Sequence, residues 1–151
     1  MKRLVAAGAL GVVVSLLAGA PALGDPPESA EASVETAACG FPVEVTFVGK
    51  SKYVEHGDQL ITIAPGSKAT FTNPRTGESI SVNTAGTFHE QVLPGGDLVG
   101  TGTGHNTFVG PAIEGILYTT GRVSYTQDAE TGTVTITAPS AKMVNLCDDL
   151  A

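Results

Sequence analysis

The segment ATFTNPRTGESISV, from Ala69 to Val82, decides the fold class because it has the pattern of a β-hairpin. Apolar and polar residues alternate before and after the central turn NPRTG, with Phe71 on one side and Ile80 on the other. A period of two is typical of strands that bury one face. Proline in the turn sets one backbone dihedral, and glycine allows the positive φ that such turns require. The segment therefore predicts two antiparallel strands.

The rest of the chain extends this pattern. Residues 123–127 and 134–136 predict a second hairpin around the turn DAETG. Further strands are expected over residues 43–47, 60–63, 87–93, 97–101, 106–109, 115–120 and 142–147. Frequent threonine and valine, 19 glycines and no long helical stripe favour an all-β domain. We predict a single antiparallel meander that closes as a small barrel, with a two-sheet β-sandwich as the alternative.

Residues 1–24 have the features of a secretory signal peptide. Two basic residues precede an apolar run over residues 4–20, and small residues then predict cleavage before Asp25. The alternatives are a membrane anchor, for which the run is short, and a lipid anchor on Cys39, which lies well downstream of the run. We therefore expect a secreted, extracellular protein that is not held at a membrane after cleavage.

Residues 25–38, DPPESAEASVETAA, predict a disordered acidic linker because they contain four acidic residues, two prolines and few large side chains. The folded domain is then expected over residues 39–149. Without the two basic residues of the signal peptide, six basic residues remain against 15 acidic ones, a formal net charge of −9. Such a charge repels phosphate backbones and anionic lipids, so we expect no nucleic-acid partner.

Cys39 and Cys147 are the two cysteines, and they nearly bracket the predicted domain. In an exported protein, two isolated thiols are more often a disulfide than a metal site, which needs further ligands. We predict that they form a disulfide that ties the N-terminal strand to the C-terminal strand.

The segment GDLVGTGTGHNTFVGP, residues 96–111, is rich in glycine and threonine. It lacks the helix start and the Gly-Lys-Ser/Thr ending of a phosphate-binding loop. We interpret its alternating glycines as relief of crowding on one face of a strand. If the segment binds a ligand, the polar groups that would orient it are His105, Asn106, Thr103, Thr101 and Tyr118, with Tyr125 as a further wall.

No catalytic motif occurs in the sequence. The three histidines have none of the spacings of metal ligands, and no serine lies in a nucleophile motif. An enzymatic site would require the fold to bring His89 or His105 to a carboxylate such as Glu90, Asp97 or Glu114. We therefore expect no catalytic residues, no cofactor and no metal.

Four short motifs resemble those of small exported actinobacterial proteins with two cysteines and a β domain. The motifs are CGFPV from Cys39, TGHN from Thr103, TTGRV from Thr119 and CDDL from Cys147. The resemblance covers most of the chain after the signal peptide, and its motifs are structural. It implies a fold and an exported location, and it carries no activity to any residue.

The function expected from these observations is that of an exported, monomeric, non-enzymatic β module. Its partner would be a small ligand, a glycan or an extracellular protein. The alternatives are a secreted enzyme, such as a hydrolase or isomerase with dispersed histidines and carboxylates, and a protease inhibitor or toxin antagonist.

Overall fold

The computed structural model describes residues 26–109, 113–139 and 142–151, so the predicted signal peptide lies outside the described residues. The described chain forms eleven β-strands and no α-helix, which confirms the all-β prediction. It accordingly contains no helix long and apolar enough to cross a membrane. The strands are β1 (Glu28–Thr36), β2 (Val43–His56), β3 (Gln59–Ala64), β4 (Lys68–Thr72), β5 (Ser79–Asn83), β6 (Gly86–Val92), β7 (Leu98–Phe108), β8 (Leu117–Thr120), β9 (Val123–Gln127), β10 (Val134–Ala138) and β11 (Lys142–Asn145).

Both predicted hairpins are present. β4 and β5 pair antiparallel, with Phe71 opposite Ile80. In the turn between them, the backbone N–H of Gly77 donates to the carbonyl of Asn73 over 2.8 Å. Gly77 has a φ of 80°, which lies in the left-handed region that favours glycine. β9 and β10 also pair antiparallel, around the predicted second turn.

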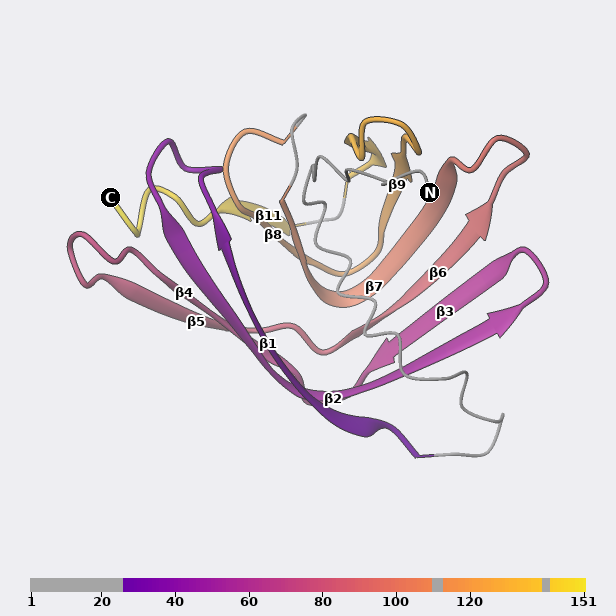
Figure 1. Ribbon diagram of the computed structural model, residues 1–151, viewed down its shortest axis with the longest axis horizontal. Helices are drawn as coiled ribbons and strands as arrows, with labels where there is room; N and C mark the ends of the chain where they lie inside the picture. The colour runs from indigo at the N-terminus through magenta and orange to yellow at the C-terminus, as the bar shows by residue number, and fades with distance from the viewer. Residues whose placement is uncertain (1–25, 110–112, 140–141) are drawn as a thin grey trace, which may run out of the picture.

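The strands form one antiparallel sheet with the order β10-β9-β7-β6-β3-β2-β4-β5. β1 also pairs with β2, and β8 and β11 extend the sheet from β7. Figure 1 shows that the sheet curves into a trough with β2 at its base. The antiparallel architecture is therefore confirmed. In the described residues, however, the hydrogen-bonded strands form one continuous sheet. It neither closes into a barrel nor separates into the two sheets of a sandwich.

Two long strands connect the parts of the sheet. β2 pairs with β1 and β4 through its first half and with β3 through its second half. β7 pairs with β6 and β9, and its last residues pair with β8. The sequence predicts two strands where the continuous β7 lies. The strand is not interrupted, because the backbones of Gly102 and Gly104 stay in register with Phe88 and Gly86 of β6.

The structure corrects the predicted disordered linker, because residues 28–36 form β1. This strand pairs residue by residue with β2, and Val34 lies opposite Val45. Val34 also packs against buried residues, while Glu31 and Glu35 are exposed. Composition alone underestimates the stability of such a segment as a strand. Backbone hydrogen bonds to an available strand edge add to the burial of its few apolar side chains.

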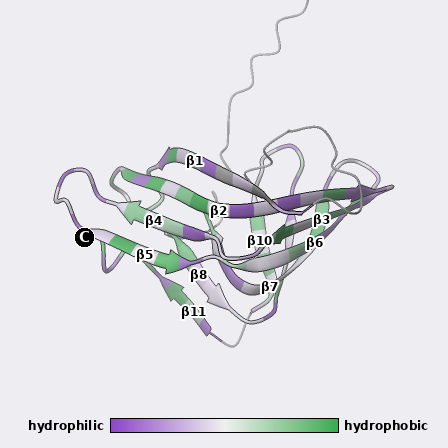
Figure 2. Ribbon diagram, turned by 90° about the horizontal axis from the view of Figure 1, so that it is seen from below, coloured by the Kyte–Doolittle hydropathy of each residue, from purple (hydrophilic) through white to green (hydrophobic). Residues whose placement is uncertain are grey.

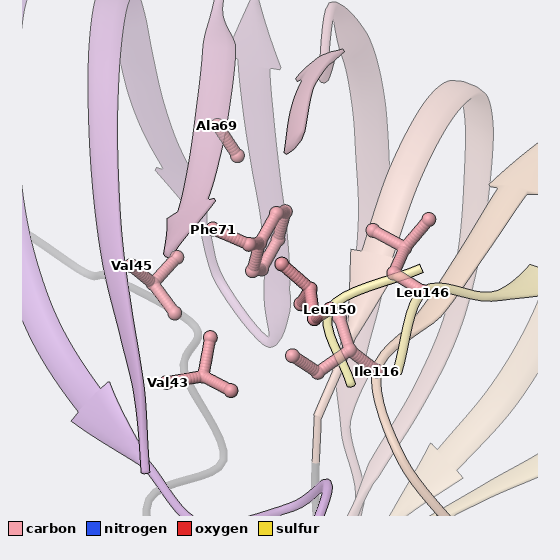
Figure 3. Close-up of a cluster of buried hydrophobic side chains, with 7 residues drawn as sticks. All are labelled: Val43, Val45, Ala69, Phe71, Ile116, Leu146 and Leu150. Atoms are coloured by element: carbon pink, nitrogen blue, oxygen red, sulfur yellow. The ribbon is translucent and has the colours of Figure 1, made fainter. Parts of the chain in front are cut away.

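Buried side chains gather in two clusters. The first joins β2 and β4 to the last part of the chain (Figure 3), and its members are Val43, Val45, Ala69, Phe71, Ile116, Leu146 and Leu150. The second lies along β7, β9 and β10 and consists of Phe108, Val123, Tyr125 and Val134. Figure 2 shows hydrophobic and hydrophilic residues within the same strands, as expected for strands that bury one face.

The predicted disulfide between Cys39 and Cys147 is present and spans 108 residues of sequence, with the two Cα atoms 5.3 Å apart. Beyond it, Leu150 is fully buried in the first cluster, and its carbonyl accepts a hydrogen bond from Asn73 Nδ2 over 2.9 Å. The packed domain therefore extends past the predicted end at residue 149.

We predict that replacing both Cys39 and Cys147 with alanine lowers the free energy of unfolding by about 4 kcal/mol, because the unfolded chain loses a cross-link that spans a long loop. Urea denaturation of the variant and of the oxidised protein measures this difference. The reduced protein serves as the control and should unfold near the midpoint of the variant. Equal midpoints for the variant and the oxidised protein would contradict the prediction.

Candidate ligand-binding site

A cavity of about 180 Å³ lies where the curved sheet brings β2 and β3 near β6, β7 and β9. Aromatic and aliphatic side chains make up much of its wall, among them Phe47, Phe88, Phe108, Val109 and Val134. Polar residues also border it, among them Thr84, Glu90, His105, Asn106 and Tyr125. A largely apolar cavity with a few polar groups is typical of small-molecule sites.

The alternating glycines of β7 make room for the side chains beside this cavity. A Cβ atom on Gly100 would collide with the ring of Tyr125. A Cβ on Gly102 would lie 3.2 Å from Phe88 and 3.1 Å from Asn106 Nδ2. Both distances are shorter than ordinary van der Waals contacts. The glycines therefore relieve crowding on this face of β7, as the sequence predicts.

Three aromatic rings form one side of the site. Phe108 and Tyr125 have ring centroids 5.2 Å apart, and Phe88 lies 6.2 Å from each of them. All three pairs have the edge-to-face arrangement that aromatic rings prefer. The rings hold one another in place, so this wall is formed before any ligand arrives.

Glu90 brings a carboxyl group into this apolar surrounding. It is 4% exposed, and the hydroxyl of Tyr125 donates a hydrogen bond to its Oε1 over 2.6 Å. Burial raises the pKa of Glu90 above its ordinary value, although the hydrogen bond from Tyr125 partly opposes this shift. Burial and the nearby carboxyl group also raise the pKa of Tyr125, so its hydroxyl remains a donor. Glu90 is thus a carboxyl group that resists ionisation.

Asn106 is the second buried polar group, with 1% of its surface exposed. Neither its Oδ1 nor its Nδ2 has a hydrogen-bond partner in the described part of the chain. Thr119 lies directly opposite on β8, and its hydroxyl also lacks a partner, so the two residues do not satisfy each other. The carboxamide is therefore enclosed between the backbones of β6 and β7, near Gly86 and Gly102.

The structure places the sequence-predicted site residues in two groups. The side chains of His105 and Asn106 point to opposite faces because they are neighbours on an extended strand. His105 Nδ1 and the Tyr118 hydroxyl share a hydrogen bond of 2.8 Å, with their rings stacked at 10°. Thr101 and Thr103 lie in the same alternation as His105. Of the five residues, His105 and Asn106 border the cavity, and Asn106 is the more deeply buried of the two.

Sequence reasoning considered Glu90 as a carboxylate for an enzymatic site but did not place it among the ligand-binding residues, although the signal was present. Phe88, Glu90 and Val92 occupy alternate positions of one strand. A carboxyl group therefore lies on the same face of β6 as two apolar side chains. His89 is exposed on the opposite face, as the alternation requires. Phe88 and Phe108 were also missed, because spacing alone does not show that distant strands face each other.

The described residues contain no cluster of histidine, cysteine, aspartate or glutamate able to hold a metal ion. Asp97, a carboxylate considered from the sequence, is exposed and accepts a hydrogen bond from the backbone of Ala129 over 2.9 Å. Glu90 and Tyr125 therefore place one hydrogen-bonded polar pair at the border of a largely apolar cavity.

We predict that Glu90→Gln stabilises the protein above neutral pH. The folded state raises the pKa of Glu90, so wild-type stability falls as the pH rises through that pKa, while the unfolded chain ionises freely. Glutamine cannot ionise and still accepts the Tyr125 hydrogen bond. Thermal unfolding should give similar stabilities near pH 4 and a higher stability of the variant than of the wild type at pH 8.

The matched control is Glu44→Gln on the exposed face of β2, where a change within about 0.5 kcal/mol is expected at both pH values. A Glu90→Gln variant that is less stable than the wild type at pH 8 would show that the folded protein uses the ionised carboxylate.

Comparisons with known proteins assign no family to the chain. No family model matches it, and no curated protein or solved structure is significantly similar to it.

Proposed function

We propose that the protein is an exported, monomeric, non-enzymatic module that binds a small, mostly apolar molecule in the cavity beside β7. The observation that carries the proposal is the largely apolar cavity, bordered by the three mutually packed rings of Phe88, Phe108 and Tyr125.

The cavity volume limits the size of this molecule. An engineered apolar cavity of about 150 Å³ binds benzene. A cavity of about 180 Å³ therefore accommodates one ring with a small substituent. The aromatic wall of Phe88, Phe108 and Tyr125 favours an apolar body that packs against ring surfaces.

The other expected ligands and functions receive less support. A glycan carries hydroxyl groups on all sides and needs more polar partners than this aromatic wall provides. An enzyme with a histidine base is disfavoured because His89 is exposed and His105 bonds to Tyr118 rather than to a carboxylate. An inhibitor would present a rigid exposed loop beside the disulfide, but the segment after β11 buries Leu146 and Leu150.

Export is part of the proposal. The Cys39–Cys147 disulfide supports it, because disulfides persist mainly in oxidising compartments outside the cytosol. The predicted signal peptide supports it from the sequence alone.

The test is native mass spectrometry of the protein purified from the medium of its natural host. We expect a small molecule to accompany the wild type and to be released on denaturation. The variant Ala64→Leu fills part of the cavity that Ala64 borders, so it should lose this molecule. The control Val99→Leu, at an exposed position of β7, should retain it.

The proposal fails if the wild type carries no molecule and also shows no saturable NMR shifts with toluene or benzamide. It also fails if Ala64→Leu, folded as judged by its NMR spectrum, retains the molecule as well as the wild type does.

A further inference from the structure

We infer that the ligand of the cavity is a small organic cation, a one-ring molecule whose ammonium group pairs with the carboxylate of Glu90. This inference rests on the proposed function and deepens it by naming the ligand class. It follows from the position of Glu90 at the cavity, from the lack of a protein cation beside it in the described chain and from the aromatic rings around it.

Tyr125 holds the Glu90 carboxyl group at the border of the cavity. Glu90 on β6 lies opposite Gly100 on β7, and Gly100 lies opposite Tyr125 on β9. Because Gly100 has no side chain, the Tyr125 ring extends over it, and the hydroxyl donates a hydrogen bond to Glu90 Oε1. Both residues border the cavity. The carboxyl group is therefore fixed through one of its two oxygens.

The second oxygen, Glu90 Oε2, remains accessible. No described residue donates a hydrogen bond to it, yet it is not one of the fully enclosed polar atoms that lack a partner. Those atoms are Thr84 Oγ1, Thr119 Oγ1 and the two amide atoms of Asn106. Since Glu90 borders the cavity and is 4% exposed, the cavity is the place where Oε2 meets a ligand.

No protein cation neutralises this carboxylate in the described part of the chain. Burial raises the pKa of Glu90 and the hydrogen bond from Tyr125 partly opposes the shift, with no contribution from a positive charge. Lys50 borders the cavity but is exposed. His105 also borders it, and its Nδ1 shares a hydrogen bond with Tyr118. A buried carboxylate is costly without a partner of opposite charge, which a cationic ligand supplies.

A second carboxyl group lies on the same face of the sheet. Glu55 on β2 is opposite Leu60 on β3, and Leu60 is opposite Glu90. The pKa of Tyr53 is raised by burial, then by Glu55, and further by the charge of Glu90. This face therefore has a negative potential, and the whole chain has a formal net charge of −7. Both favour the approach of a cation and oppose that of an anion.

The aromatic rings add a second attraction for an organic cation. Phe88, Phe108 and Tyr125 border the cavity, and the face of an aromatic ring attracts an ammonium group. The same rings pack against the apolar body of the ligand. A metal ion fits less well, because it requires several ligands and the described residues contain no cluster that could hold one.

Three probes with the same ring and different charge test the inference: benzylamine, benzyl alcohol and benzoate. Isothermal titration at pH 7.5 should give benzylamine an affinity at least about tenfold above that of benzyl alcohol, the size of effect expected for one hydrogen bond to a charged group. Benzoate should bind most weakly. The variant Glu90→Gln should bind benzyl alcohol at least as tightly as benzylamine. The control Glu44→Gln removes the same charge from an exposed position of β2 and should keep the wild-type order.

The outcomes separate this inference from the proposed function. If benzyl alcohol binds to the wild type as tightly as benzylamine, the cavity binds ligands but the cation inference is wrong. Tighter binding of benzoate than of benzylamine, a preference for benzylamine that persists in Glu90→Gln, or a natural ligand without an amine likewise overturns it. If no probe binds and no molecule accompanies the natural protein, both proposals fail. Should Glu90→Gln not fold, the order of the three probes in the wild type decides alone.

Discussion

The pairing of β2 on both of its edges is the constraint on which the rest of the structure depends. β2 pairs with β1 and β4 along its first half and with β3 along its second half, so this strand changes partners midway along its length. Gly49 lies at this change, and a Cβ there would collide with Ser67. The resulting bend directs the β4–β5 hairpin one way and β3, β6 and β7 the other. The cavity borders β2 at this change of partners, from Phe47 to Ser51.

Local patterns in the sequence predict those features that depend mainly on residues near one another in the chain or on residue type. The two hairpins follow from alternation and turn residues, and the disulfide follows from two cysteines in a chain expected to be exported. β1 could not be predicted from its composition, because its stability depends on the free edge of β2 at Val43–Ser51. The continuity of β7 was hidden for the same reason, since Gly102 and Gly104 favour a strand only with β6 beside them.

The candidate site shows more clearly that local sequence patterns do not predict which residues of distant strands meet. His105 and Asn106 are adjacent in sequence, yet the alternation of a strand separates their side chains onto different faces. Glu90 and Tyr125 are 35 residues apart, yet they share a hydrogen bond across the backbone of Gly100. A sequence motif groups neighbours along the chain, whereas an antiparallel sheet groups residues across strands. A single sequence gives little information on which strands are neighbours.

An open sheet has free edges at which further chains can add by backbone hydrogen bonding, the route to fibrous aggregates. Among the described strands, those with one hydrogen-bonded neighbour are β1, β5, β10 and β11. The edge at β10 is interrupted by a shift of register between Ile136 and Ala138, and Pro139 follows without an N–H to donate. The opposite edge, β5, is five residues long, and the chain turns away after it as the Asn83 side chain accepts a hydrogen bond from Ala85. Irregular and short edges of this kind leave an incoming strand few consecutive partners, whereas β1 is nine residues long and pairs with β2 without a shift of register. Among the described strands, the outer edge of β1 therefore offers an incoming strand more consecutive partners than the edges at β5 and β10.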